Sequence, residues 1–146
     1  MMLLINNWDI EDSNNEVLVT RNKETGENEL RYIISDLGGS FGKTGGFFSR
    51  SRNKPSDYVE ADFIEAVKAD VIDFNYGGKS KKLFDNITIS DAKWIGSLLT
   101  RLSDEQIKDA FRASNYPPDE VERLSVALKQ RIEALKNVSS QVASRP

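Results

Sequence analysis

The stretch that decides the fold begins with Trp8-Asp9-Ile10-Glu11-Asp12-Ser13-Asn14-Asn15 and ends with Ile33-Ile34-Ser35-Asp36-Leu37-Gly38. Between these two segments, residues 16–20 are β-prone and residues 22–28 form a polar loop with one glycine; Leu30, Tyr32 and Ile34 then take alternate positions. Alternation beside a short polar loop is typical of a β-hairpin. The sequence therefore predicts a hairpin over residues 16–35.

Three polar side chains flank this hairpin: Asp9 and Asn14 precede it, and Asp36 follows it directly. Because a hairpin returns its ends to the same place, we expect these side chains to lie close together. Two carboxylates and an amide offer the oxygen ligands that Mg²⁺ or Mn²⁺ prefers. The pattern predicts a divalent-cation site suited to a nucleotide phosphate. Taken singly, Asp9 and Asn14 are also common turn and helix-cap residues, so that interpretation stays open.

The composition excludes several other kinds of site. The 146 residues include no cysteine and no histidine, which removes disulfide scaffolds, thiolate zinc sites and Ser-His-Asp triads. Lys and Arg total 20 against 23 Asp and Glu, a net charge of −3, which argues against a general nucleic-acid binder. No stretch approaches the roughly 20 apolar residues of a membrane span, and no signal peptide is recognisable, which favours the cytoplasm for this chain. The apolar residues 1–5 look like the end of a hydrophobic helix, which suggests a fragment.

The chain is expected to form one domain over residues 1–146. Its first part, residues 1–55, holds the hairpin and a loop that carries five glycines between residues 36 and 55. Ser56 is the expected N-cap of a helix with an apolar stripe of Tyr58, Phe63, Ile64 and Val67. A short strand is predicted over residues 71–76.

Further helices are predicted within a helical part, residues 56–138. Ser90 is expected to cap a run with Ile95, Leu98, Leu99 and Leu102 at helical spacing. Ser103 to Gln106 is a capping box, and Pro117-Pro118 starts a helix with the stripe Val121, Leu124, Leu128, Ile132 and Leu135. Residues 139–146 are expected to fray. The fold class is therefore α+β, with one hairpin followed by a mostly helical bundle.

The order of these motifs resembles the protein-kinase-like fold. Asp9-x-x-x-x-Asn14, a hairpin and Asp36-Leu37-Gly38 are similar to its catalytic loop and metal-binding Asp-Phe-Gly. The approach Asn6-Asn7-Trp8, without histidine, looks more like the atypical phosphoinositide-kinase-like or HipA-like branches. The whole chain is also similar to a bacterial group of kinase-like proteins with an Asn-Asn-Trp-Asp stretch and an Asp-Leu-Gly-x-x-Phe-Gly-Lys-Thr-Gly loop.

The resemblance implies the C-terminal lobe of a phosphotransferase that uses Mg²⁺ (or Mn²⁺) and ATP to phosphorylate a hydroxyl group. Asp9 would be the catalytic base or hydroxyl-orienting carboxylate. Asn14 would hold a second metal ion, and Asp36 would bind the Mg²⁺ that bridges the nucleotide phosphates. Only eight residues precede Asp9, so the nucleotide-covering N-terminal lobe is missing, and we expect little or no kinase activity from this chain alone. Glu11 stands where kinases often carry a lysine, and its charge should repel phosphate.

Two other functions stay open. A degenerate kinase lobe could serve as a non-catalytic interaction module, which Glu11 favours. Residues 38–44 also invite a P-loop interpretation, with Lys43 as the nucleotide-binding residue. However, the glycine spacing is one residue short, and Gly45-Gly46 disfavours the helix that a P-loop needs. The cations between Lys43 and Lys54 are expected to be solvated, although contact with an acidic substrate is the alternative.

Overall fold

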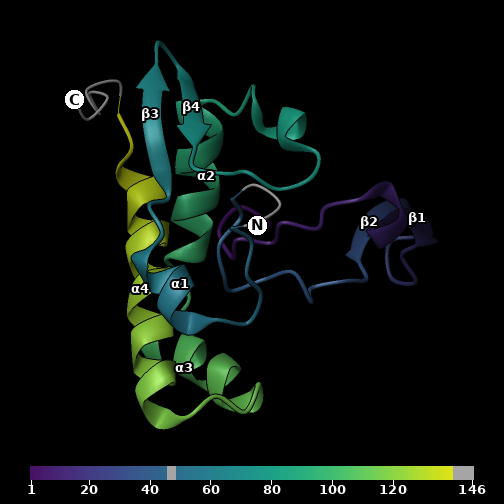
Figure 1. Cartoon of the computed structure of the whole chain (residues 1–146). Helices are drawn as coiled ribbons and strands as arrows, with labels where there is room; N and C mark the ends of the chain where they lie inside the picture. Colours follow the sequence, from purple (N-terminus) through teal and green to yellow (C-terminus); the bar gives the residue numbers. More distant parts are fainter. Residues whose placement is uncertain (46–48, 140–146) are drawn as a thin grey trace.

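The computed structural model describes residues 1–45 and 49–139. Within them the chain is α+β, with two small antiparallel hairpins and four α-helices (Figure 1). One hairpin projects from the side of the molecule, whereas the other contributes Ile72 and Phe74 to the core beside the helices. Among the described residues, no helix is long and apolar enough to cross a membrane.

The hairpin predicted over residues 16–35 is confirmed. Strand β1 (Asn15–Arg21) pairs with β2 (Asn28–Ile34), with Val17 opposite Tyr32 and Val19 opposite Leu30. Asn22 organises the turn, because its side-chain oxygen accepts hydrogen bonds from two backbone N–H groups, that of Glu24 at 2.8 Å and that of Thr25 at 3.2 Å. The polar loop is therefore an Asx turn, a structure that asparagine favours.

A second hairpin stands where the sequence predicted a longer helix. Helix α1 (Pro55–Glu60) is short, and β3 (Ile64–Lys68) pairs with β4 (Val71–Phe74). The prediction of a helix that includes Phe63, Ile64 and Val67 is therefore wrong. The strand predicted over residues 71–76 is confirmed, and it covers residues 71–74. Ser56 is not the cap, because Lys54 takes that position without a side-chain hydrogen bond. No turn signal in the sequence marks this hairpin. Ala69 forms the turn with a φ of +54°, a conformation for which glycine or asparagine would be the usual residue.

Three helices complete the chain: α2 (Ile89–Leu99), α3 (Asp104–Ala113) and α4 (Pro118–Asn137). The capping box predicted at Ser103 is confirmed. Helix α2 is capped by Thr88 instead of Ser90. The Thr88 hydroxyl accepts a hydrogen bond from the Asp91 N–H at 3.1 Å, and the Asp91 carboxylate accepts one from the Thr88 N–H at 3.0 Å. This reciprocal pair is a capping box, so the cap lies two residues before the predicted one.

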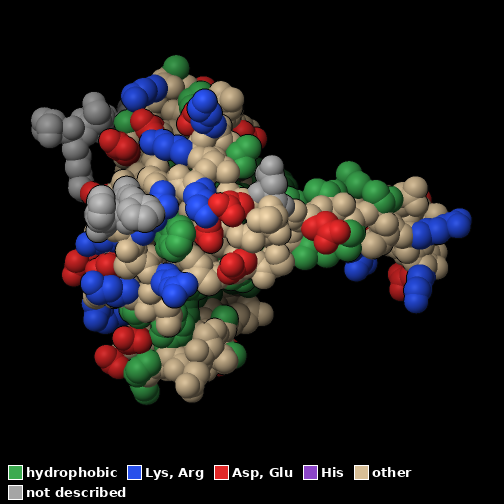
Figure 2. All heavy atoms as spheres, turned by 45° about the vertical axis from the view of Figure 1, so that its right-hand side comes forward, with side chains coloured by type: hydrophobic (Ala, Val, Ile, Leu, Met, Phe, Trp, Pro, Cys, Tyr) green, Lys and Arg blue, Asp and Glu red, His purple; other side chains and the backbone are tan. Residues whose placement is uncertain are grey.

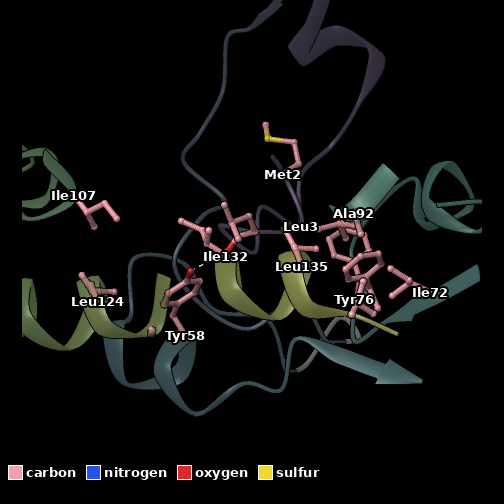
Figure 3. Packing of buried hydrophobic residues seen from close by; sticks show 14 of the residues in the cluster. Met2, Leu3, Tyr58, Ile72, Tyr76, Ala92, Ile107, Leu124, Ile132 and Leu135 are labelled. Atoms are coloured by element: carbon pink, nitrogen blue, oxygen red, sulfur yellow. Dashed lines mark hydrogen bonds between the residues drawn. The ribbon is translucent and has the colours of Figure 1, made fainter. Parts of the chain in front are cut away.

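Helix α4 is the centre of the core and packs against α1, α2 and α3 (Figure 1). Its buried apolar side chains include the predicted Val121, Leu124, Ile132 and Leu135. Leu3 and Tyr58 lie beside them (Figure 3), and the Tyr58 hydroxyl donates a hydrogen bond to the Leu4 carbonyl at 2.8 Å. Residues 2–6 form turns instead of the end of a regular helix.

The two parts predicted on either side of residues 55 and 56 share one core. The second part contains the β3–β4 hairpin as well as helices, and its core includes Leu3 and Leu4 from the first part. The part predicted to be mainly helical, with one short strand at residues 71–76, therefore holds a second strand, β3, that pairs with β4. The fraying predicted for residues 139–146 falls, except for Ser139, outside the described residues.

Candidate functional site

The base of the β1–β2 hairpin brings the predicted site residues into one neighbourhood. Asn14 ends a 3-10 turn immediately before β1, and Ser35 follows β2. The Ser35 N–H and hydroxyl both donate hydrogen bonds to the Asn14 carbonyl, at 3.0 and 3.2 Å. Asp36 is the next residue, so strand pairing places it beside Asn14 although 21 residues separate Asn14 from Ser35.

Asn7 links the loop of Asp9 to the loop of Asp36. Its amide nitrogen donates a hydrogen bond to the Asp36 carbonyl at 3.0 Å, and its amide oxygen accepts one from the Asp9 N–H at 2.9 Å. Asn7 is fully buried. Sequence reasoning did not single out Asn7 as a site residue. No local pattern in the sequence marks it, because its role follows from its burial between the two loops, where a buried amide needs hydrogen-bond partners.

The Asn14 and Asp36 side chains are oriented by bonds to the backbone. The Asn14 amide nitrogen donates to the Asp9 carbonyl at 3.2 Å, which leaves its amide oxygen facing the Ser13 hydroxyl at 3.5 Å, longer than a strong hydrogen bond. One Asp36 carboxylate oxygen accepts a hydrogen bond from the Gly38 N–H at 2.7 Å. Asp36 is exposed, and Asn14 and Asp9 are half-buried, so the neighbourhood opens to solvent.

Gly39 lets the two loops approach closely. A Cβ atom at this position would lie 2.9 Å from the Asn7 amide oxygen and 3.1 Å from the Asp9 Cβ. The Gly39 carbonyl also accepts a hydrogen bond from the Trp8 N–H at 3.3 Å. The second glycine of Asp36-Leu37-Gly38-Gly39 is therefore required by contact with the Asp9 loop.

Lys79, from the loop after β4, also reaches this site. Its ammonium nitrogen lies 2.6 Å from Asp9 Oδ1 and also pairs with Glu11. Hydrogen bonds to Asp9 and Glu11 raise the pKa of Lys79. Sequence reasoning did not single out Lys79, because nothing local indicates that it meets residues near the start of the chain. Glu11, whose charge we expect to repel phosphate, is paired with a cation here.

The donor set fits a hard divalent cation. Asp36, Asn14 and Asp9 would supply carboxylate and amide oxygens, the ligands that suit Mg²⁺ and Mn²⁺. In the part of the chain that the structure describes, no group of three or more Asp, Glu, His or Cys side chains is placed to hold a metal ion. A site here would therefore depend on the Asn14 amide and on phosphate oxygens to complete the coordination.

Lys43 lies in a different environment. Its backbone N–H donates a hydrogen bond to the Ser51 hydroxyl at 2.9 Å, and its ammonium is 3.8 Å from Asp57 Oδ1. The Ser51 hydroxyl and the charges of Lys54 and Lys43 hold the pKa of Asp57 below its usual value. The next residue, Thr44, forms an antiparallel bridge to Arg50 instead of opening a helix. Among the described residues 38–45 no helix begins, so Lys43 and Thr44 do not stand at the helix N-terminus that a P-loop uses.

Three of the six described non-glycine residues with a positive φ angle lie close in sequence to residues of the site. Asn6, Phe41 and Ser80 adopt φ angles of +53°, +54° and +55°, a region that costs about 1–2 kcal/mol for a residue with a Cβ atom. Asn6 precedes Asn7, Ser80 follows Lys79, and Phe41 lies two residues after Gly39. The Phe41 ring is held by Tyr58 and Phe111, with centroid separations of 5.3 Å in both cases. Strain held in place by packing is common at functional sites.

Comparison of the chain with protein-family models, with curated proteins and with solved structures found no match.

Proposed function

We propose that this chain is the C-terminal lobe of a kinase-like phosphotransferase, which moves a phosphoryl group from Mg-ATP to a hydroxyl group. The observation that carries the proposal is the hydrogen-bond network at the base of the hairpin. Asn7 joins the Asp9 loop to the Asp36 loop, and the Asn14 amide bonds back to the Asp9 carbonyl. This network joins the loops that carry two carboxylates and an amide, in the order that the resemblance implies.

Each residue has a separate task in this proposal. Asp9, with 23% of its side chain exposed, would orient the acceptor hydroxyl or take its proton. Asn14 and Asp36 would hold the metal ion, which when bound neutralises charge on the phosphate oxygens. Asn7 and Gly39 set the spacing between the two loops. Phosphoryl transfer depends mainly on such positioning and on charge, and little on covalent chemistry by the protein.

The exposed face of the hairpin supports a covering partner. Val17, Val19, Leu30 and Tyr32 share one face of β1–β2 and are between 57 and 76% exposed (Figure 2). A contiguous apolar patch of this kind usually marks a contact surface. A nucleotide-covering lobe is the occupant that we propose, and with the 146 residues alone we expect little or no ATP turnover.

A non-catalytic interaction module is the second candidate. It is favoured by the ion pair between Lys79 and Asp9, which already occupies the proposed catalytic carboxylate. In that case the apolar face would bind a partner protein, and neither metal ions nor nucleotides would perturb the hairpin base.

A Mn²⁺ titration followed by NMR tests the proposed function. Paramagnetic Mn²⁺ is expected to broaden the backbone signals of residues 7–14 and 35–39 in the wild-type chain. The double variant Asp9→Asn, Asp36→Asn is expected to lose this broadening, because both carboxylates of the site are gone.

The matched control is Asp70→Asn, Asp85→Asn, which removes the same charge at two exposed positions. The control should show the wild-type broadening. Broadening that is unchanged in the Asp9, Asp36 variant would contradict the shared metal site and leave the interaction module as the better explanation.

A further inference from the structure

We propose that Lys79 is the phosphate-binding cation of this site, and that its ammonium group contacts the terminal phosphate of a bound nucleotide. The inference rests on the proposed function, because it needs a nucleotide phosphate beside Asp9 and Asp36. It assigns to Lys79 the positive charge that the resemblance would place at position 11. The two positions are separated by 68 residues in sequence but are in contact in the fold.

Lys79 is held against the Asp9 loop by its backbone. The Lys79 N–H donates a hydrogen bond to the Trp8 carbonyl at 2.8 Å. The next residue, Ser80, donates from its hydroxyl to the Ile10 carbonyl at 2.7 Å. The acceptors of these two bonds, Trp8 and Ile10, flank Asp9. The bonds therefore fix the position of the loop after β4 relative to the Asp9 loop.

Two further residues build this junction. The buried Tyr76 hydroxyl lies 3.0 Å from both the Asn7 and the Lys79 carbonyl oxygens, so it can donate to either loop. Gly78 has no room for a side chain, because a Cβ atom would come within 2.3 Å of the Tyr76 oxygen and 2.7 Å of the Trp8 Cα. Gly78 and the buried Tyr76 therefore allow the loop of Lys79 to pack closely against the loop of Asp9.

The Lys79 side chain is paired with two carboxylates but is open to the solvent from which a phosphate would approach. One ammonium lies between two carboxylates, those of Asp9 and Glu11, and 38% of the Lys79 side chain is exposed. Such a half-exposed ion pair contributes little to stability and can exchange partners. The terminal phosphate of a nucleotide carries more negative charge than one carboxylate, and a charge-assisted hydrogen bond to a phosphate oxygen is a strong one. Glu11 then acts as a second anchor that keeps the cation beside Asp9.

Calorimetric titration of the whole chain with two probes, Mg-ATP and Mn²⁺ alone, tests this assignment. In Lys79→Met, Mg-ATP binding is expected to weaken about tenfold, the equivalent of one lost charge-assisted hydrogen bond. Mn²⁺ alone should bind at least as tightly as to the wild type, because a positive charge beside the metal ligands has been removed. The opposite response of the two probes separates phosphate binding from a structural role, which would weaken both.

Two variants serve as controls. Lys82→Met removes the same charge at an exposed position in the same segment and should change neither titration. Lys79→Arg keeps the charge and should retain most of the Mg-ATP affinity. Three outcomes would each overturn the assignment while leaving the metal site in place in the wild type. They are wild-type Mg-ATP affinity in Lys79→Met, loss of binding of both probes in Lys79→Met, and loss of Mg-ATP binding in Lys79→Arg. A wild-type chain that binds neither probe would overturn the proposed function and the assignment together.

Discussion

Arg131 lies in α4 with only 5% of its surface exposed, and oxygen atoms from two other segments, residues 4–6 and 58–61, surround its guanidinium group. It donates hydrogen bonds to the Leu4 carbonyl at 3.2 Å, to the Asn6 amide oxygen at 2.7 Å and to the Tyr58 carbonyl at 3.0 Å. The group also lies over the Tyr58 ring, 4.0 Å from its centroid. Burial lowers the pKa of Arg131. Since the Asn6 amide nitrogen in turn bonds to the Gly42 carbonyl at 2.8 Å, Arg131 supports the loops that form the candidate site.

Replacement of Arg131 by Met should therefore destabilise the protein strongly. The variant leaves buried carbonyl and amide oxygens without donors, each of which costs about 1–3 kcal/mol, so we expect a loss of at least about 3 kcal/mol in the free energy of unfolding. Urea denaturation followed by circular dichroism measures it. Arg123→Met, on the exposed side of the same helix, should stay within about 0.5 kcal/mol of the wild type. Equal urea midpoints for the two variants would contradict a supporting role for Arg131.

The residue scale also shows what the sequence could and could not predict about the site. It was predictable that Asp9, Asn14 and Asp36 would lie near one end of a hairpin, because the alternation of apolar and polar residues indicates its strands. Their chemical roles remain predictions. Asn7 and Lys79 were not predicted. Lys79 meets Asp9 only through the packing of the loop after β4 against the first residues of the chain, and no local pattern encodes a contact over such a distance.

At the scale of elements, turn chemistry decided which predictions succeeded. The β1–β2 hairpin was visible because Asn22 and a glycine mark its turn. The β3–β4 hairpin was not, because Ala69 takes a left-handed conformation that alanine rarely adopts, and Phe63, Ile64 and Val67 can also be spaced on one face of a helix. Helix α4 was predictable, since its apolar stripe from Val121 to Leu135 persists over about four turns and Pro118 opens it.

The N-cap of α2 gives a test at this scale. Thr88→Ala should destabilise the protein by about 1 kcal/mol, because the capping hydroxyl and its reciprocal bond with Asp91 are lost. Ser90→Ala, at the cap that the sequence had suggested, should change the free energy of unfolding by less than about 0.5 kcal/mol. Thermal or urea unfolding of the two variants measures both changes in the free energy of unfolding. A larger effect at Ser90 than at Thr88 would place the start of α2 two residues later than the structure does.

At the scale of the whole molecule, the chain combines a packed body with a hairpin arm (Figures 1 and 2). The body is built on α4, and Leu3, Leu4, Ile72 and Phe74 join its core from other parts of the chain. The arm is joined to the body by the hydrogen bonds of Asn7, Asn14 and Ser35, which are also the bonds of the candidate site. The same bonds therefore connect the base of the arm to the loops of Asp9 and Asp36.

This arrangement predicts uneven protection from hydrogen exchange. A two-stranded hairpin without apolar packing is marginal in water, so the amides of β1 and β2 should exchange much faster than those of α4. The β3–β4 hairpin is the internal control: it is of similar size, but Ile72 and Phe74 are buried, and its amides should be slower. Exchange measured by mass spectrometry compares the three elements in one experiment. If β1–β2 is as protected as β3–β4 in the isolated chain, the apolar face of the arm is covered in solution and cannot be the open surface on which a nucleotide-covering lobe would rest.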